Sequence, residues 1–238
     1  MRSALHAEWT KLRTAPGTFA LLVAVVVATI GVSAAASACD GPGCGADLPR
    51  LSLTGVQLGQ AVVAILAVLV MGNEHSTGMV RVTLTALPRR ARVLAAKAAV
   101  TAGAVAAASV VAVAGAVVVS RTLLPAHTFV LRPAAGSVLY LVLVGLLSLG
   151  VTTAVRSPAA AIGVVLGLLY ALPIVTTVVT DPEWQDRLRR FGPATAGLAV
   201  QATTGEPVIG PWKGLGVLAL WALGTLLVGG VLFARRDA

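Results

Sequence analysis

Residues 54–72, TGVQLGQAVVAILAVLVMG, contain no charge, and residues 73–90, NEHSTGMVRVTLTALPRR, are crowded with polar and basic side chains. The first stretch is long enough to cross a bilayer, because a helix of about twenty apolar residues spans the hydrocarbon layer. The second stretch has to leave that layer. The chain therefore alternates between segments that suit lipid and segments that suit water.

Composition extends this pattern to the whole chain. Of its 238 residues, 57% are hydrophobic and 11% are charged, which excludes an ordinary soluble domain. Apolar runs of spanning length occur at 18–36, 54–72, 94–120, 136–155, 158–180 and 213–234. They predict an all-α polytopic membrane protein, with six transmembrane helices forming one domain over residues 1–238.

The basic residues predict the orientation of the spans. Six spans place both termini on one side, and the segments of that side hold eleven of the eighteen Lys and Arg residues. Positive residues favour the cytoplasmic side, so we expect both termini in the cytoplasm of a cell membrane. The richness in Ala and Arg points to a bacterium.

The net charge of +9 does not indicate nucleic-acid binding, because the basic residues lie between apolar runs and no known nucleic-acid module is present. No charged residue falls clearly inside a span, although proton-driven carriers usually need an acidic residue or a histidine there. The Walker A pattern is absent, and His6, His75 and His127 lack metal-ligand spacing. We expect no catalytic residue, cofactor or metal in this chain.

The N-terminal stretch SALHAEWTKLRT, residues 3–14, has the spacing of an interfacial helix. Leu5, Trp9 and Leu12 are expected on one face, and the basic residues, including Lys11, are available to lipid headgroups on the other. The alternative is a basic flank that only orients the first span.

Residues 73–92 predict a short helix beside the membrane. Ser76 or Thr77 can cap it, Val80, Leu84 and Leu87 share a face, and Pro88 ends it before a basic cluster. A simple positive anchor would need only the arginines, and this alternative stays open.

The stretch GNEHSTGMVRVTLTALPRRARVLAAK, residues 72–97, resembles the segment after the second span of exporter-type (type-2) ABC transporter permeases. The matching positions are Glu74, Thr77, Gly78, Arg81, Leu84, Pro88, Arg90 and Lys97. The opening AEWTKLRT is similar to the amphipathic N-terminal helix of that family through Glu8, Lys11 and Leu12. In one departure, Thr77 precedes Gly78, where many relatives have Gly and then Thr.

The resemblance implies a division of labour between subunits. Residues 73–92 would be a coupling segment that docks on a separate ABC ATPase subunit, which binds the ATP and Mg. Two permease chains, identical or related, would pair around the transport path in the lipid membrane. The resemblance also makes residues 181–204 a lid over the substrate exit; a plain surface connector is the alternative.

Two smaller patterns are left open by the sequence. Cys39 and Cys44 flank a turn in an outer loop, where they can form a disulfide or stay as two thiols. Gly163 and Gly167 form a small-residue stripe that can pack within one chain or at a dimer interface.

An ABC exporter permease is thus the leading interpretation. The alternatives are a secondary carrier, a membrane anchor or immunity-type protein without an ATPase partner, and an intramembrane enzyme. The absence of intramembrane acids disfavours the carrier, and the absence of catalytic pairs disfavours the enzyme.

Overall fold

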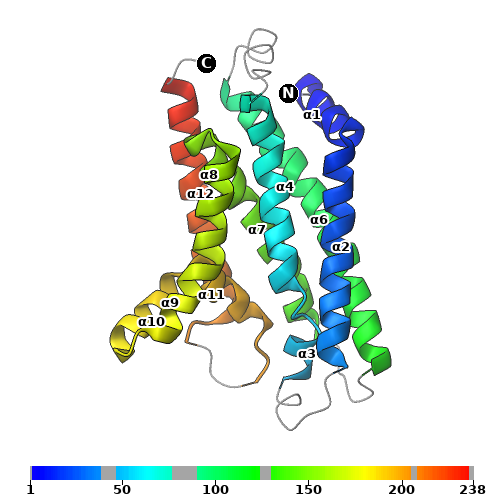
Figure 1. The fold of residues 1–238 in the computed structure, drawn as a ribbon, viewed down its shortest axis with the longest axis vertical. Helices are drawn as coiled ribbons and strands as arrows, with labels where there is room; N and C mark the ends of the chain where they lie inside the picture. The colour runs from blue at the N-terminus through cyan, green and yellow to red at the C-terminus, as the bar shows by residue number, and fades with distance from the viewer. Residues whose placement is uncertain (1, 39–46, 77–89, 124–129, 205–207, 236–238) are drawn as a thin grey trace.

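The computed structural model describes residues 2–38, 47–76, 90–123, 130–204 and 208–235, and regular structure in these ranges is entirely helical (Figure 1). The elements are α1 (Arg2–Thr14), α2 (Pro16–Ser37), α3 (Leu48–Leu51), α4 (Val56–Ser76), α6 (Arg90–Leu123), α7 (Leu131–Val155), α8 (Pro158–Leu166), a π-helical turn (Gly167–Ala171), α9 (Leu172–Val178), α10 (Pro182–Phe191), α11 (Pro193–Leu198), a 3₁₀ turn (Ala199–Gln201) and α12 (Pro211–Arg235).

Six helical stretches are long and apolar enough to cross a membrane, which confirms the predicted fold class. A helix suits this setting because it satisfies its own backbone hydrogen bonds where no water is available. Proline begins three of the stretches, at Pro16, Pro158 and Pro211. A first-turn proline gives up only an N–H group that has no partner inside the helix.

Helix α7 forms the centre of the bundle and packs against α12, α4 and α6. Its side chains supply much of the core, including Tyr140, Leu141 and Leu147, none of which is exposed. Helix α2 packs against α6 and α4 on the other side of the molecule (Figure 1).

Two helix crossings depend on glycine. A Cβ atom at Gly150 of α7 would lie 2.6 Å from the backbone nitrogen of Leu226 in α12, and one at Gly229 would lie 2.7 Å from the carbonyl oxygen of Gly150. A Cβ atom at Gly55 would similarly lie 1.9 Å from the carbonyl oxygen of Thr29 in α2. Small residues thus let these backbones meet directly, as is common in membrane bundles.

The fifth spanning stretch is interrupted. A π-helical turn at Gly167–Ala171 separates α8 from α9, and Pro173 is the second residue of α9. Proline cannot donate the backbone hydrogen bond of a regular helix, and a π turn is one way to absorb that loss. Beyond α9, helix α10 projects sideways from the bundle (Figure 1).

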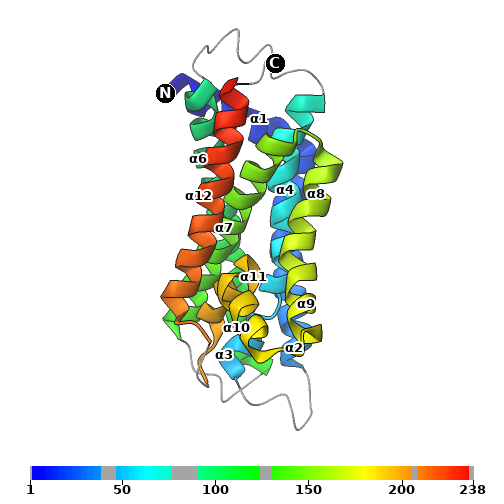
Figure 2. The same ribbon diagram turned by 90° about the vertical axis from the view of Figure 1, so that its left-hand side faces the viewer.

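The two ends of the bundle differ. Helix α1 lies across one end, where it packs against α6 and α2 (Figures 1 and 2). Helices α3, α10 and α11 lie at the other end. The described ends of the chain are therefore on the same side, as an even number of spans requires.

A candidate functional site where three helices meet

Four charged side chains meet at the end of the bundle that carries α1. Lys97 Nζ of α6 lies 2.6 Å from Glu8 Oε2 of α1 and 3.0 Å from Glu74 Oε1 of α4. Lys11 Nζ of α1 lies 2.8 Å from the same Glu74 oxygen and 3.2 Å from Glu8 Oε1. Each ammonium group contacts both carboxylates, so the four residues form a closed ring, called here the charge ring.

The charge ring is neutral and mostly buried. Glu8 is 6% exposed, Glu74 8% and Lys97 2%, whereas the side chain of Lys11 is 37% exposed. Taking such charges out of water is costly, and close pairing offsets that cost. Breaking a buried pair by removing one partner typically costs about 3–5 kcal/mol. The ring therefore ties α1, α4 and α6 together strongly at this end.

The face of α1 explains how the ring assembles. Glu8 and Lys11 are three residues apart, which places them side by side on a helix. Leu5 and Leu12 are half-buried on either side of Glu8, while Trp9 is 51% exposed. The face of α1 that contacts the bundle therefore centres on Leu5, Glu8 and Leu12. Trp9 is exposed, and its predicted position at the membrane interface stays a prediction.

Two residues of the charge ring lie near helix ends. Lys97, the eighth residue of the long helix α6, is a charge near the start of the predicted span 94–120, whereas Glu74 lies in the last turn of α4, beyond the predicted span 54–72. Glu74 is poorly placed for the helix dipole, because a helix C-terminus favours positive groups. Its contacts with Lys11 and Lys97 compensate for that position.

The electrostatics of Lys11 follow from its neighbours. Partial burial alone would lower the pKa of Lys11, but hydrogen bonds and charge attraction from Glu74 and Glu8 outweigh burial and raise the pKa above its usual value. The charge of Lys11 is thus maintained through the neutral range.

A cavity of about 280 Å³ lies beside the charge ring. Its walls include Thr18 of α2, Asn73 of α4 and Thr101 of α6, together with the ring residues. It holds no cluster of metal-ligand residues within the described chain.

The structure reaches only part of the predicted coupling segment. Glu74 lies in the ring, and Arg90 is the first residue of α6. The predictions for Thr77, Gly78, Arg81, Leu84 and Pro88, and the possible disulfide of Cys39 and Cys44, fall outside the described residues. Since α4 ends at Ser76, the ring lies directly before the segment that the sequence singles out.

Gly163 and Gly167 do not pack against any described helix of this chain. A Cβ atom at either position would meet nothing within 4 Å. The stripe therefore lies on the outer surface of the fifth spanning stretch. The earlier glycine pair, Gly55 and Gly59, instead packs on Thr29 of α2.

At the opposite end, the outer segment begins with helix α10, which Asp181 caps. Asp181 Oδ1 accepts hydrogen bonds from the backbone N–H groups of Glu183 and Trp184, at 2.9 and 3.5 Å. The Asp47 carboxylate holds the end of this segment in place. It accepts hydrogen bonds from the hydroxyl and backbone N–H groups of Thr203, at 2.5 and 2.8 Å. The sequence analysis missed Asp47, because the contact joins residues 156 positions apart.

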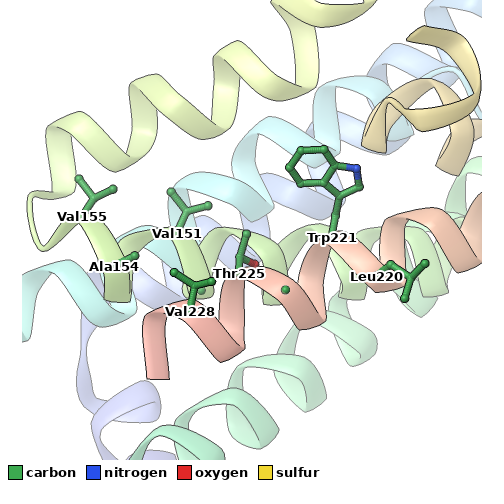
Figure 3. Close-up of a pocket in the computed structure, with 9 residues that line it drawn as sticks. Val151, Ala154, Val155, Leu220, Trp221, Thr225 and Val228 are labelled. Carbon is green, nitrogen blue, oxygen red and sulfur yellow. The ribbon is translucent and has the colours of Figure 1, made fainter. Parts of the chain in front are cut away.

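A groove of about 500 Å³ runs between α7 and α12 (Figure 3). Valine, alanine and glycine residues of α7 form one wall, and Leu220, Trp221 and Val228 of α12 form the other. Among the described residues, no titratable side chain lines it. Such a largely apolar surface suits lipid chains.

Comparison with known proteins gives one family. The family model described as ABC-2 family transporter protein matches residues 4–180. No curated protein matches the chain in a sequence search. The matched range includes all four residues of the charge ring and five of the six spanning stretches.

Proposed function

Because this chain belongs to the ABC-2 transporter protein family, we propose that it is the membrane-spanning permease subunit of an ATP-driven exporter, coupled to a separate ATPase subunit. The family membership makes it a multi-pass membrane protein of transport. Proteins of this family generally partner with an ATPase subunit. ATP and Mg would bind to that partner.

The charge ring is the observation that carries the proposal. It joins α1 and α6 to the last turn of α4, directly before residues 77–89. A force applied to that segment by an ATPase would reach three helices together, because separating them exposes buried charges. The ring thus supports a role for residues 73–92 as a coupling segment on the cytoplasmic side.

The same geometry disfavours a proton-driven carrier. A proton relay needs an acidic group that can change its partners along a path. Glu8 and Glu74 each contact both lysines, and their ring lies at one end of the bundle. The ring therefore serves better as a structural tie than as a relay.

A second permease chain is part of the proposal. Gly163 and Gly167 present a smooth surface that the described helices of this chain leave uncovered. Close helix approach at such stripes is a common mode of association in membranes. We propose that the fifth spanning stretch of a second chain packs here, so that two permeases enclose the path.

The test is purification of the tagged full chain from its native membrane in mild detergent. An ATP-binding subunit should copurify with the wild type and be lost when Arg81 and Leu84 are changed to Ala. Glu74→Ala is tested separately, because it also breaks the charge ring. The control is Arg190→Ala, on the exposed face of α10 at the opposite end.

Each outcome separates the hypotheses. Loss of the ATPase from the Arg81/Leu84 variant, with retention by the control, supports both the permease function and the position of the coupling segment. If the wild type brings down no ATPase, the anchor and secondary-carrier hypotheses replace the exporter.

A further inference from the structure

A second cavity lies at the outer end of the bundle, far from the charge ring. It occupies about 540 Å³ between the start of α4, helix α9 and the segment α10–α11. This volume is in the range of about 300–1,000 Å³ that is usual for small-molecule sites. Residues of five helices, α3, α4, α9, α10 and α11, form its walls, so its shape depends on the folded bundle.

Two arginines give this cavity its charge. Arg50 of α3 and Arg189 of α10 both line it, and no Asp or Glu among the described residues does. In the described part of the chain, neither guanidinium group forms an ion pair with a carboxylate. Arginine suits carboxylate and phosphate groups, because its N–H groups match their oxygens in pairs.

The remaining walls of the cavity are largely apolar. Leu169, Pro173 and Ile174 line it from the fifth spanning stretch, and Leu198 lines it from α11. Gln60 closes the inner end among these residues; it is 2% exposed and accepts a hydrogen bond from the Tyr140 hydroxyl. The cavity thus combines a positive rim with an apolar interior.

Several hydrogen bonds hold the walls in place. The Thr195 hydroxyl donates to the carbonyl oxygen of Arg189 at 2.9 Å, which fixes the end of α10 against α11. The side-chain amide of Gln185 donates to the carbonyl oxygen of Thr176 at 2.9 Å, which ties α10 to α9. The backbone positions of Arg189 and of the α9 wall are therefore set before any ligand arrives.

We propose that this outer cavity binds an amphiphilic anion. Its apolar body lies against Leu169, Pro173 and Ile174, and its carboxylate or phosphate group pairs with the guanidinium groups of Arg50 and Arg189. We place this cavity at the outer end of the transport path, and that placement rests on the proposed function. The binding of the anion does not depend on it.

The experiment measures binding without any ATPase. The full chain is placed in phosphatidylcholine nanodiscs, and labelled dodecyl phosphate is titrated, with empty nanodiscs subtracted. Dodecyltrimethylammonium, with the same chain and the opposite charge, is the comparison probe. We expect saturable binding of the phosphate probe and only background uptake of the cation.

Variants locate the site. Arg50→Gln and Arg189→Gln should each weaken dodecyl phosphate binding by about tenfold, since a charge-assisted hydrogen bond is lost. Arg189→Lys should keep most of the affinity for dodecyl phosphate. The matched control, Arg190→Gln, removes the same charge from the adjacent residue, which is exposed and does not line the cavity. A monodisperse elution profile is required of every variant.

A third arm identifies the source of the anion. Nanodiscs that contain phosphatidylglycerol should compete with dodecyl phosphate if the natural ligand is a membrane lipid, and should leave its affinity unchanged if the ligand is a free amphiphile. Equal binding of both charged probes, or equal weakening by Arg190→Gln, would overturn the proposal. If the probe binds but no ATPase copurifies, only the exporter function is contradicted. If an ATPase copurifies but the phosphate probe does not bind, only this inference is contradicted.

Discussion

Lys97 of α6 donates a hydrogen bond to Glu8 of α1 at 2.6 Å, across 89 positions of sequence, and both side chains are buried. The contact links a helix that lies across the end of the bundle to one of its longest spanning helices (Figures 1 and 2). The contact holds α1 against the bundle at that end, in addition to the connection of α1 to α2 along the chain.

Changing Lys97 to Met should therefore destabilise the protein by about 3–5 kcal/mol, because two buried carboxylates would then share only Lys11. The measurement is equilibrium unfolding in mixed micelles. Arg92→Met, at an exposed position of the same helix, should change stability by less than about 0.5 kcal/mol. Equal effects of the two substitutions would contradict the structural role of the charge ring.

The crossing of α7 and α12 should not tolerate a methyl group at Gly150. Gly150→Ala places a Cβ atom 2.6 Å from the backbone nitrogen of Leu226, so the helices must separate, at a cost of about 1–3 kcal/mol. Gly103→Ala, where a Cβ atom meets nothing within 4 Å, should be neutral or slightly stabilising. Thermal unfolding of both variants checks this difference, and similar losses would show that the crossing is less tight than described.

Acid should loosen the end of the outer segment. Burial would raise the pKa of Asp47, but hydrogen bonds from Thr203, Arg50 and Thr204 outweigh it and lower the pKa below its usual value. The stabilisation is thus complete above the unfolded pKa and is lost as pH falls through the lower, folded pKa. Amide hydrogen exchange at Thr203 and Thr204, corrected for intrinsic rates, should show falling protection below about pH 4.

Two variants control the acid experiment. Asp47→Asn removes the titrating carboxylate, so protection of Thr203 and Thr204 should already be reduced at neutral pH and should change little on acidification. Asp186→Asn, at an exposed position of α10, should behave as the wild type does. Acid sensitivity that persists in Asp47→Asn would assign the effect to another group.

The proposed pairing of permease chains predicts a cross-link. A Cβ atom at position 163 would meet nothing within 4 Å among the described residues, so Gly163→Cys should fold normally and form a disulfide-linked dimer in oxidised membranes. Gly103→Cys, which is equally uncovered on α6, should remain monomeric on a non-reducing gel. Cross-linking from position 103 and not from 163 would move the interface to α6.

Hydropathy was sufficient to predict the six spanning stretches, because each is a local property of about twenty residues. Helix α10 of the outer segment carries similarly local signals, with Asp181 as its cap and Pro182 in its first turn. The charge ring could not be predicted in this way, because it joins α1, α4 and α6 over sequence separations of 63 and 89 residues. A lysine seven residues into α6 was the available signal: a charge in an apolar helix needs a partner.

The burial of Glu8 was missed for a related reason. Helical spacing groups Leu5, Trp9 and Leu12 on one face, and hydropathy alone places Glu8 in water, whereas the structure buries it in the charge ring. A buried carboxylate is predictable only when its cationic partner is known.

The central claim is that residues 73–92 contact an ATPase, and site-specific photo-cross-linking in native membranes tests it most directly. A photoreactive amino acid is placed at Leu84 in the full chain, and at Asp186 of α10 as the control at the opposite end. Mass spectrometry of the cross-linked partners should identify an ATP-binding subunit from position 84 and none from position 186. Capture of no ATPase at position 84, or equal capture at both positions, would contradict the account.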